Sequence, residues 1–71
     1  MHRIPVRSSN VASVGYDESS STLEVEFKSG SVYRYFGVPV QHFHALSSGS
    51  VSAGHYLNTE IKPHYRYQQV A

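Results

Sequence analysis

The 71-residue chain contains no cysteine and no tryptophan, and none of its apolar runs is long. Without cysteine, neither a disulfide bond nor a thiolate metal site can support the fold. A membrane-spanning helix needs about 18 or more consecutive apolar residues, and residues 1–5 lack the apolar run of a signal peptide. We therefore expect a cytoplasmic protein with no membrane partner.

Charge of either sign is also scarce, since six lysines and arginines stand against five acidic residues. The resulting net charge of +1 argues against a protein that covers many phosphates of a nucleic acid duplex. A chain of this length forms one domain with a marginal core. We expect an N-terminal arm at residues 1–7 and a single domain at 8–71, for which homo-oligomerisation is a usual source of extra stability.

Tyrosine, by contrast, is abundant, with six copies. Two of them form the pattern Tyr33-Arg34-Tyr35, in which the tyrosines share one face of a strand and the arginine points to the other. The pattern follows the clearest strand of the chain, residues 22–27, where leucine, valine and phenylalanine alternate with glutamate. That alternation predicts one buried face and one solvated face.

The turn between these two strands decides whether the tyrosines join the buried face. A two-residue turn would place Val25 opposite Arg34. A three-residue turn over residues 28–30, with its glycine left-handed, would place Val25 opposite Tyr33 and bring Glu24 across from Arg34. We favour the three-residue turn because it pairs opposite charges across the strands. In that register both tyrosines lie on the apolar face.

The first strand and the tail flank this hairpin. Residues 10–16 are expected to form the first strand, with Val11 and Ser13 on the same face. The tail, residues 61–70, either adds a fourth strand or stays irregular, because Pro63 disfavours the start of a central strand.

Two short helices are expected between the hairpin and the tail. Pro39 suits the first turn of a helix at residues 40–46, and Ser50 suits the N-cap of a second helix that ends near Asn58. The predicted fold class is therefore α+β: a small three-stranded antiparallel meander with two short helices on one face. If the C-terminal tail forms a strand, it is the fourth strand of this sheet.

No pattern of catalytic or metal-binding residues stands out. His42 and His44 are two residues apart and so lie on different faces of a helix, whereas zinc-binding helices use a spacing of four. Glu24 and Glu26 share the solvated face of a strand, where pairing with Arg34 explains them, and neither a Walker loop nor a dinucleotide fingerprint is present. We expect no metal, no cofactor and no enzymatic activity.

Tyrosines interleaved with cations favour a binding role. Aromatic faces stack on bases and cations neutralise phosphate, which suits single-stranded nucleic acid or a free nucleotide. The turn register favours a core position for Tyr33 and Tyr35, and the contacts then shift to the second helix and to Lys62, Tyr65 and Arg66 in the tail. All candidate ligand-binding residues together are Asn10, Tyr33, Arg34, Tyr35, His55, Tyr56, Asn58, Lys62, Tyr65 and Arg66.

A family resemblance rests on the central tyrosine pattern at 33–35 and on stretches in a fixed order. These are 8–10, 15–17, 23–27 with Gly30, 38–39, 52–58, Ile61-Lys62 and Tyr65. Over about residues 8 to 67 the chain resembles the KTSC domain, named for its occurrence at the C-terminus of some lysyl-tRNA synthetases. The family also occurs as free-standing small proteins of bacteria and their phages. For function the resemblance suggests RNA binding, through the attachment to a tRNA-handling enzyme.

We therefore expect a non-enzymatic binding module for RNA or a nucleotide-like ligand, with tyrosine faces for stacking and a few cations for phosphate. The low charge favours a short single strand or a free nucleotide over a duplex, since each phosphate contact needs its own cation. The alternative is a protein-interaction or homo-oligomerisation module, in which the same tyrosines form the core or an interface.

Overall fold

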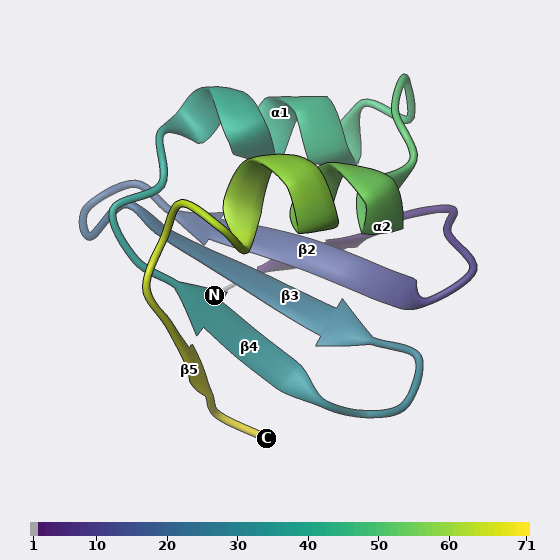
Figure 1. Ribbon diagram of the computed structural model, residues 1–71, viewed down its shortest axis with the longest axis horizontal. Coiled ribbons are helices and arrows are strands. Elements are labelled where there is room, and N and C mark those ends of the chain that lie inside the picture. The colour runs from purple at the N-terminus through teal and green to yellow at the C-terminus, as the bar shows by residue number, and fades with distance from the viewer. Residues whose placement is uncertain (1) are drawn as a thin grey trace.

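The computed structural model describes residues 2–71, and Met1, the first residue of the expected arm, lies outside them. The described chain forms a five-stranded antiparallel sheet in the order β1-β2-β3-β4-β5. Helices cover one face of this sheet (Figure 1), and none is long and apolar enough to span a membrane. The predicted α+β class, with its helices on one face, is confirmed. The elements are β1 (Arg3–Pro5), β2 (Val11–Asp17), β3 (Thr22–Phe27), β4 (Val32–Tyr35), α1 (Val40–Ser47), α2 (Ala53–Tyr56), the π-helix η1 (Leu57–Ile61) and β5 (Tyr67–Gln69).

Strands β3 and β4 pair in the register favoured from the sequence. Val25 lies opposite Tyr33, and Glu24 lies opposite Arg34. The connecting turn ends at Gly30, whose φ of +98° is a left-handed conformation that glycine adopts without a steric cost. The turn therefore directs both tyrosines of β4 to the side of the sheet that faces the helices.

Two strands extend the predicted meander. Residues 3–5 of the predicted arm pair with β2 as β1, and within the predicted tail Tyr67–Gln69 forms the additional strand β5 beside β4. Pro5 ends β1, and Pro63 precedes β5. Pro5 lies in an edge strand, where a proline without an N–H group costs no ladder hydrogen bond, and Pro63 lies four residues before β5, outside the ladder.

Strand β2 contains a bulge that changes the side of the sheet on which the Val11 side chain lies. The pairing register with β3 shifts between Val11 and Ser13, so an extra residue is accommodated there. Val11 and Val14 are therefore both fully buried, each with 0 % of its surface exposed. The prediction that Val11 and Ser13 share a face of a regular strand is wrong, because the bulge interrupts the alternation on which it relied.

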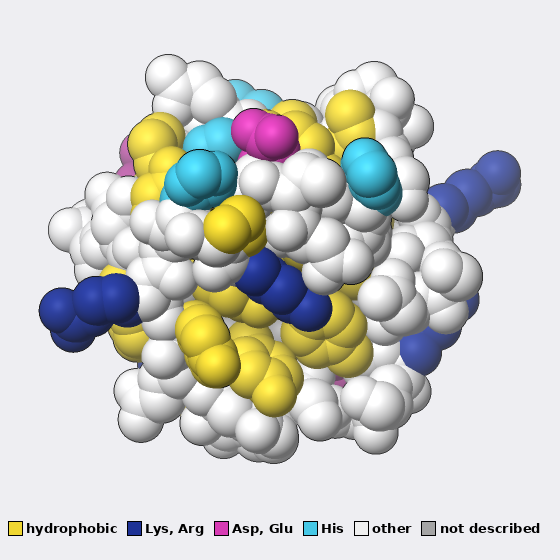
Figure 2. All heavy atoms as spheres, in the orientation of Figure 1, with side chains coloured by type: hydrophobic (Ala, Val, Ile, Leu, Met, Phe, Trp, Pro, Cys, Tyr) yellow, Lys and Arg dark blue, Asp and Glu magenta, His cyan; other side chains and the backbone are white. Residues whose placement is uncertain are grey.

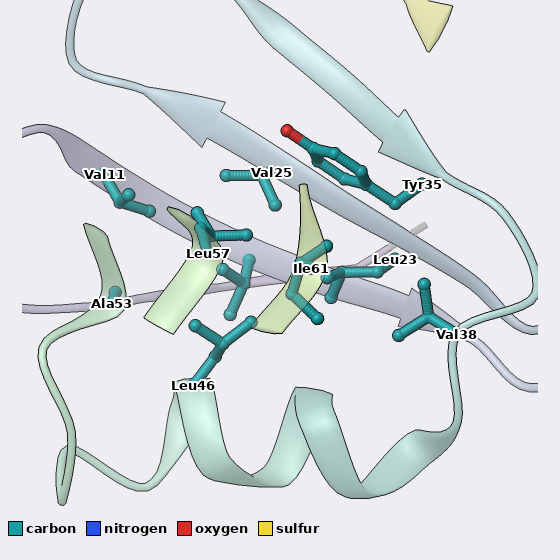
Figure 3. Close-up of a cluster of buried hydrophobic side chains, with 10 residues drawn as sticks. Val11, Leu23, Val25, Tyr35, Val38, Leu46, Ala53, Leu57 and Ile61 are labelled. Atoms are coloured by element: carbon teal, nitrogen blue, oxygen red, sulfur yellow. The ribbon is translucent and has the colours of Figure 1, made fainter. Parts of the chain in front are cut away.

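The hydrophobic core lies between the sheet and the helices, and side chains from both layers meet in it (Figure 3). The Tyr16 hydroxyl donates a hydrogen bond to the Val38 carbonyl, and its ring stacks on Phe43 at 5.7 Å between centroids. These contacts fasten α1 and the segment before it to β2. The buried core residues are Val11, Val14, Leu23, Val25, Tyr35, Val38, Leu46, Ala53, Leu57 and Ile61.

The second helix differs from the prediction at both ends. Ser52, and not Ser50, is the N-cap, and its hydroxyl accepts a hydrogen bond from the His55 N–H group. The helical backbone also continues past the predicted end near Asn58 as η1. Leu57 and Ile61 are 1 % and 0 % exposed, and burial of two large apolar side chains outweighs the weak helix propensity of one asparagine.

The sheet face away from the helices is less solvated than the alternation predicts. Glu24 is only 6 % exposed, and its carboxylate lies 2.9 Å from Arg34 Nε and 3.5 Å from Arg3 Nε. Glu26 accepts a hydrogen bond of 2.8 Å from the Ser13 hydroxyl. The predicted pairing of Glu24 with Arg34 is confirmed. The prediction that Glu24 is solvated is wrong, because β1 places a second arginine over its carboxylate.

Candidate functional site

The sheet extends beyond the cover of its helices, which lie mainly over β2 and β3 and leave β4 and β5 open (Figure 1). A hollow of about 730 Å³ lies on this part of the molecule, a size typical of small-ligand sites. Four aromatic residues line it together with two lysines, and polar residues of the β1–β2 and β3–β4 connections complete its rim.

The aromatic rings pack against one another and form the floor of the hollow. Tyr33 is central, with its ring centroid 5.7 Å from Phe27, 6.5 Å from Tyr35 and 5.7 Å from Tyr67. Tyr35 is only 2 % exposed, whereas Tyr67 is 61 % exposed, and Tyr33 is half-buried. Tyr35 therefore anchors the cluster in the core, while Tyr33 and Tyr67 offer ring surface to a ligand.

The charge that lines the hollow is positive. Lys62 and Lys28 both belong to the lining, and no acidic side chain among residues 2–71 does. Lys62 Nζ lies 5.6 Å from the centroid of the Phe27 ring, within the range of a cation–π contact. Figure 2 shows a cationic side chain that crosses the hydrophobic patch in the middle of this face. An anion with an aromatic part matches this combination.

Tyr35 keeps its proton in this setting. Burial, with a smaller contribution from Tyr33 and Tyr67, raises the pKa of Tyr35 to about 12. At neutral pH its hydroxyl is therefore a hydrogen-bond donor, and no phenolate is present to repel an anionic ligand.

The predicted site residues divide among several places. Asn10, Tyr33, Tyr35 and Lys62 line the hollow. Asn10 lies close against α2, because a Cβ atom on Gly54 would overlap its side-chain oxygen. The exposed residues His55, Asn58 and Arg66 do not line the hollow, and Arg34 is paired with Glu24 on the opposite face of the sheet.

Tyr56 and Tyr65 are joined to each other through His42, a residue that the sequence analysis considered only as a metal ligand and rejected because of its spacing from His44. His42 Nδ1 lies 2.7 Å from the Tyr56 hydroxyl, and its Nε2 lies 3.2 Å from the Tyr65 hydroxyl. Both tyrosines pack against the core, and burial, with Glu60 and Tyr65 nearby, raises the pKa of Tyr56. This hydrogen-bonded chain fastens α1 to α2 and to the segment that leads into β5. Within residues 2–71 no group of three histidine or acidic side chains could hold a metal ion.

Phe27, Lys28 and Tyr67 line the hollow but were not among the predicted site residues. Phe27 could have been found, because it closes the same apolar alternation that contains Val25. Tyr67 could not, since only the pairing of β4 with β5, which sets Tyr67 opposite Tyr35, shows that its ring joins the cluster.

A second hollow of about 420 Å³ is lined by Arg34, Phe36 and Asp17, among others. Hydrogen bonds from Ser19 and Ser20 lower the pKa of Asp17, so its carboxylate stays charged and opposes an anionic ligand there. The larger hollow is therefore the better candidate site.

Comparison with known proteins agrees with this architecture. The family model of the KTSC domain matches residues 7–65. The chain belongs to the KTSC domain family. The crystal structure of a KTSC domain protein from Yersinia pestis superposes with a TM-score of 0.89 at 33 % sequence identity, covering 99 % of this chain and 97 % of that one. The family predicted from the sequence is thus confirmed.

Two further relatives place the KTSC domain in different contexts. An uncharacterised protein from Stutzerimonas stutzeri (strain A1501) is 44 % identical over 71 residues, which are 99 % of both chains. A lysine–tRNA ligase from Trichormus variabilis is 39 % identical over 56 residues, which are 79 % of this chain and 10 % of the ligase. The KTSC domain thus corresponds to a small part of the ligase.

Proposed function

We propose that this KTSC domain is a non-enzymatic binding module that stacks a base of single-stranded RNA, or of a nucleotide-like ligand, on the rings of the hollow. The observation that carries the proposal is the combination of a ring cluster with two lysines and no acidic side chain among the described residues that line the hollow. The hollow lies on the helix-facing side of β4 and β5.

The energetics of stacking support this function. A base that stacks on an aromatic side chain gains about 1–3 kcal/mol, and the 61 % exposed Tyr67 offers the largest free ring surface of the cluster. Lys62 and Lys28 can meet phosphate, while Asn10 and Ser9 supply polar groups for base edges. Two cations suit a short single strand or a nucleotide better than a duplex.

The lining of the hollow also supports a role in binding rather than in catalysis. A serine nucleophile needs a neighbouring base, and neither a histidine nor a carboxylate lines the hollow in the described chain. The relation to lysine–tRNA ligases favours RNA among the possible ligands, because enzymes with that name act on an RNA.

The test compares two aromatic substitutions. Tyr67→Leu removes an exposed ring of the floor, and Phe36→Leu removes the ring of another exposed residue, which does not line the hollow; Tyr67 and Phe36 are 61 % and 37 % exposed. Binding is measured by fluorescence anisotropy with 5′-fluorescein-labelled RNA hexamers of each base, in competition with the four nucleoside monophosphates. We expect Tyr67→Leu to weaken binding about 5- to 150-fold and Phe36→Leu to leave it unchanged. Equal losses in both variants, or no binding of any probe by the wild type, would reject the proposal.

A further inference from the structure

The two edges of the sheet differ in their capacity to pair with another strand. Edge strand β1 carries Arg3 and ends on Pro5, and charge and proline are the usual features that prevent edge pairing. Edge strand β5 has the sequence Tyr-Gln-Gln, is exposed throughout, and contains neither a charge nor a proline. Nothing in β5 itself discourages the addition of a further strand.

The outer backbone groups of β5 can be identified from its hydrogen bonds to β4. The Phe36 N–H donates to the Arg66 carbonyl, and the Val70 N–H donates to the Val32 carbonyl. Residues that face a partner alternate along an antiparallel ladder. Tyr67 and Gln69 therefore turn their N–H and C=O groups outward, where no strand within residues 2–71 pairs with them.

We infer that β5 pairs with β5 of a second copy of this chain, antiparallel about a two-fold axis that passes through Gln68. In this register Tyr67 lies opposite the partner's Gln69, and Gln69 lies opposite the partner's Tyr67. The outward N–H and C=O groups of both residues then all find partners, because directly opposed residues of this kind exchange both hydrogen bonds. The result is one continuous sheet across two molecules.

A second copy fits this edge because the edge is complementary to itself. Its residues are neutral, and in the two-fold register each Arg66 falls opposite the partner's Val70, so like charges do not face each other. Tyr67 and Val70, which are 61 % and 42 % exposed, come to lie against the other molecule. A three-residue strand buries far less than the ~1,200 Å² of a stable interface, so the association is weak and transient.

The pairing would also join the two aromatic floors. Tyr67 and the partner's Tyr67 are diagonal neighbours in this register, a separation of about 7–8 Å that aromatic side chains can bridge. The inference itself does not depend on any ligand, because it rests on the backbone of β5.

The test follows amide protection and mass in solution as the concentration of the chain rises from about 20 μM to about 2 mM, the range for a weak complex. We expect the Tyr67 and Gln69 amides to gain protection from exchange with concentration, while the Gln68 amide, bonded to β4, is protected throughout. Sedimentation velocity should show the average mass rising over the same range. A monomer at 2 mM whose Tyr67 and Gln69 amides stay unprotected would overturn the inference.

A matched pair of variants isolates the backbone contribution. Gln69→Pro removes an N–H group that points away from β4, so the intramolecular pairing has no bond to lose. Gln69→Ala keeps that N–H group and controls for the hydrogen bond of 3.2 Å from the Tyr33 hydroxyl to the Gln69 side chain. We expect at least a tenfold weaker association for the proline variant and wild-type association for the alanine variant. Equal association of both variants would show that the edge of β5 is not the interface.

Discussion

Replacing Lys62 with alanine should halve the salt dependence with which the chain binds single-stranded RNA. Lys62 and Lys28 are the two cations that line the hollow. Each phosphate contact contributes a slope of about −0.7 to the plot of log K against log salt concentration. Two contacts predict a slope of about −1.4, so that a rise from about 50 to about 200 mM salt weakens binding roughly sevenfold. One contact predicts a slope of about −0.7 and roughly a 2.6-fold loss.

The control for this prediction is Arg66→Ala, which removes the same charge from an exposed residue that does not line the hollow. Anisotropy titrations of an RNA hexamer at four salt concentrations give the slope for each variant. We expect the Arg66 variant to keep the wild-type slope, although both variants have the same net charge. A wild-type slope for Lys62→Ala, or an equal reduction in both variants, would refute the assignment of Lys62 to a phosphate.

Two predictions concern the stability of the fold. The pKa of Tyr35 is raised to about 12 from about 10 in the unfolded chain, so its stabilising contribution is complete below pH 10 and is lost as the pH rises toward 12. Relative to Tyr35→Phe, the wild type should lose about 1–2 kcal/mol of unfolding free energy over this window in urea titrations, because Tyr35 lines the hollow and solvent reduces the full effect of the pKa shift. If the unfolding free energies of the two proteins instead changed in parallel with pH, burial would not be the cause of the raised pKa. Arg34→Ala leaves the 6 % exposed Glu24 without its cation at 2.9 Å, and should cost about 1.5–3 kcal/mol, against at most about 0.5 kcal/mol for the exposed Arg66→Ala. Equal losses in the two arginine variants would contradict a structural role for the ion pair.

Features that depend on neighbouring residues could be predicted from the sequence. The glycine that ends the β3–β4 turn and the opposite charges of Glu24 and Arg34 together set the strand register, which the structure confirms. Pro39 marks the beginning of α1 at Val40 in the same way. The turn glycine and Pro39 act within a few residues of the structure that they determine, and Glu24 and Arg34 are ten residues apart within a single hairpin.

Features that depend on distant pairing could not be predicted. The two edge strands form because β2 and β4 offer them free edges, although Pro5 and Pro63 disfavour strands locally. Glu24 is buried because Arg3 of β1 lies over its carboxylate. The helical backbone continues past Asn58 because Ile61 is buried in the core. In each case tertiary contact overrides the local preference.

The candidate site shows the same division. The turn register predicts that Tyr33 and Tyr35 face the core, and the structure buries Tyr35 but leaves Tyr33 half-buried at the floor of the hollow. The reason is that α2 and η1 do not reach over all of β4. Tyr67 completes the floor from a segment that is more than thirty residues away along the chain, which no local pattern could reveal.

The most direct test of the binding proposal is an NMR titration of the isotopically labelled chain with single-stranded RNA hexamers, read at the aromatic side chains. We predict that ring resonances of Tyr33, Tyr67 and Phe27 shift together, with the Lys62 side chain, as RNA is added. The Phe36 ring, which lies outside the hollow, should not shift. Shifts centred on Phe36 and Arg34, or no shifts at saturating RNA, would contradict the assignment of the hollow as the binding site.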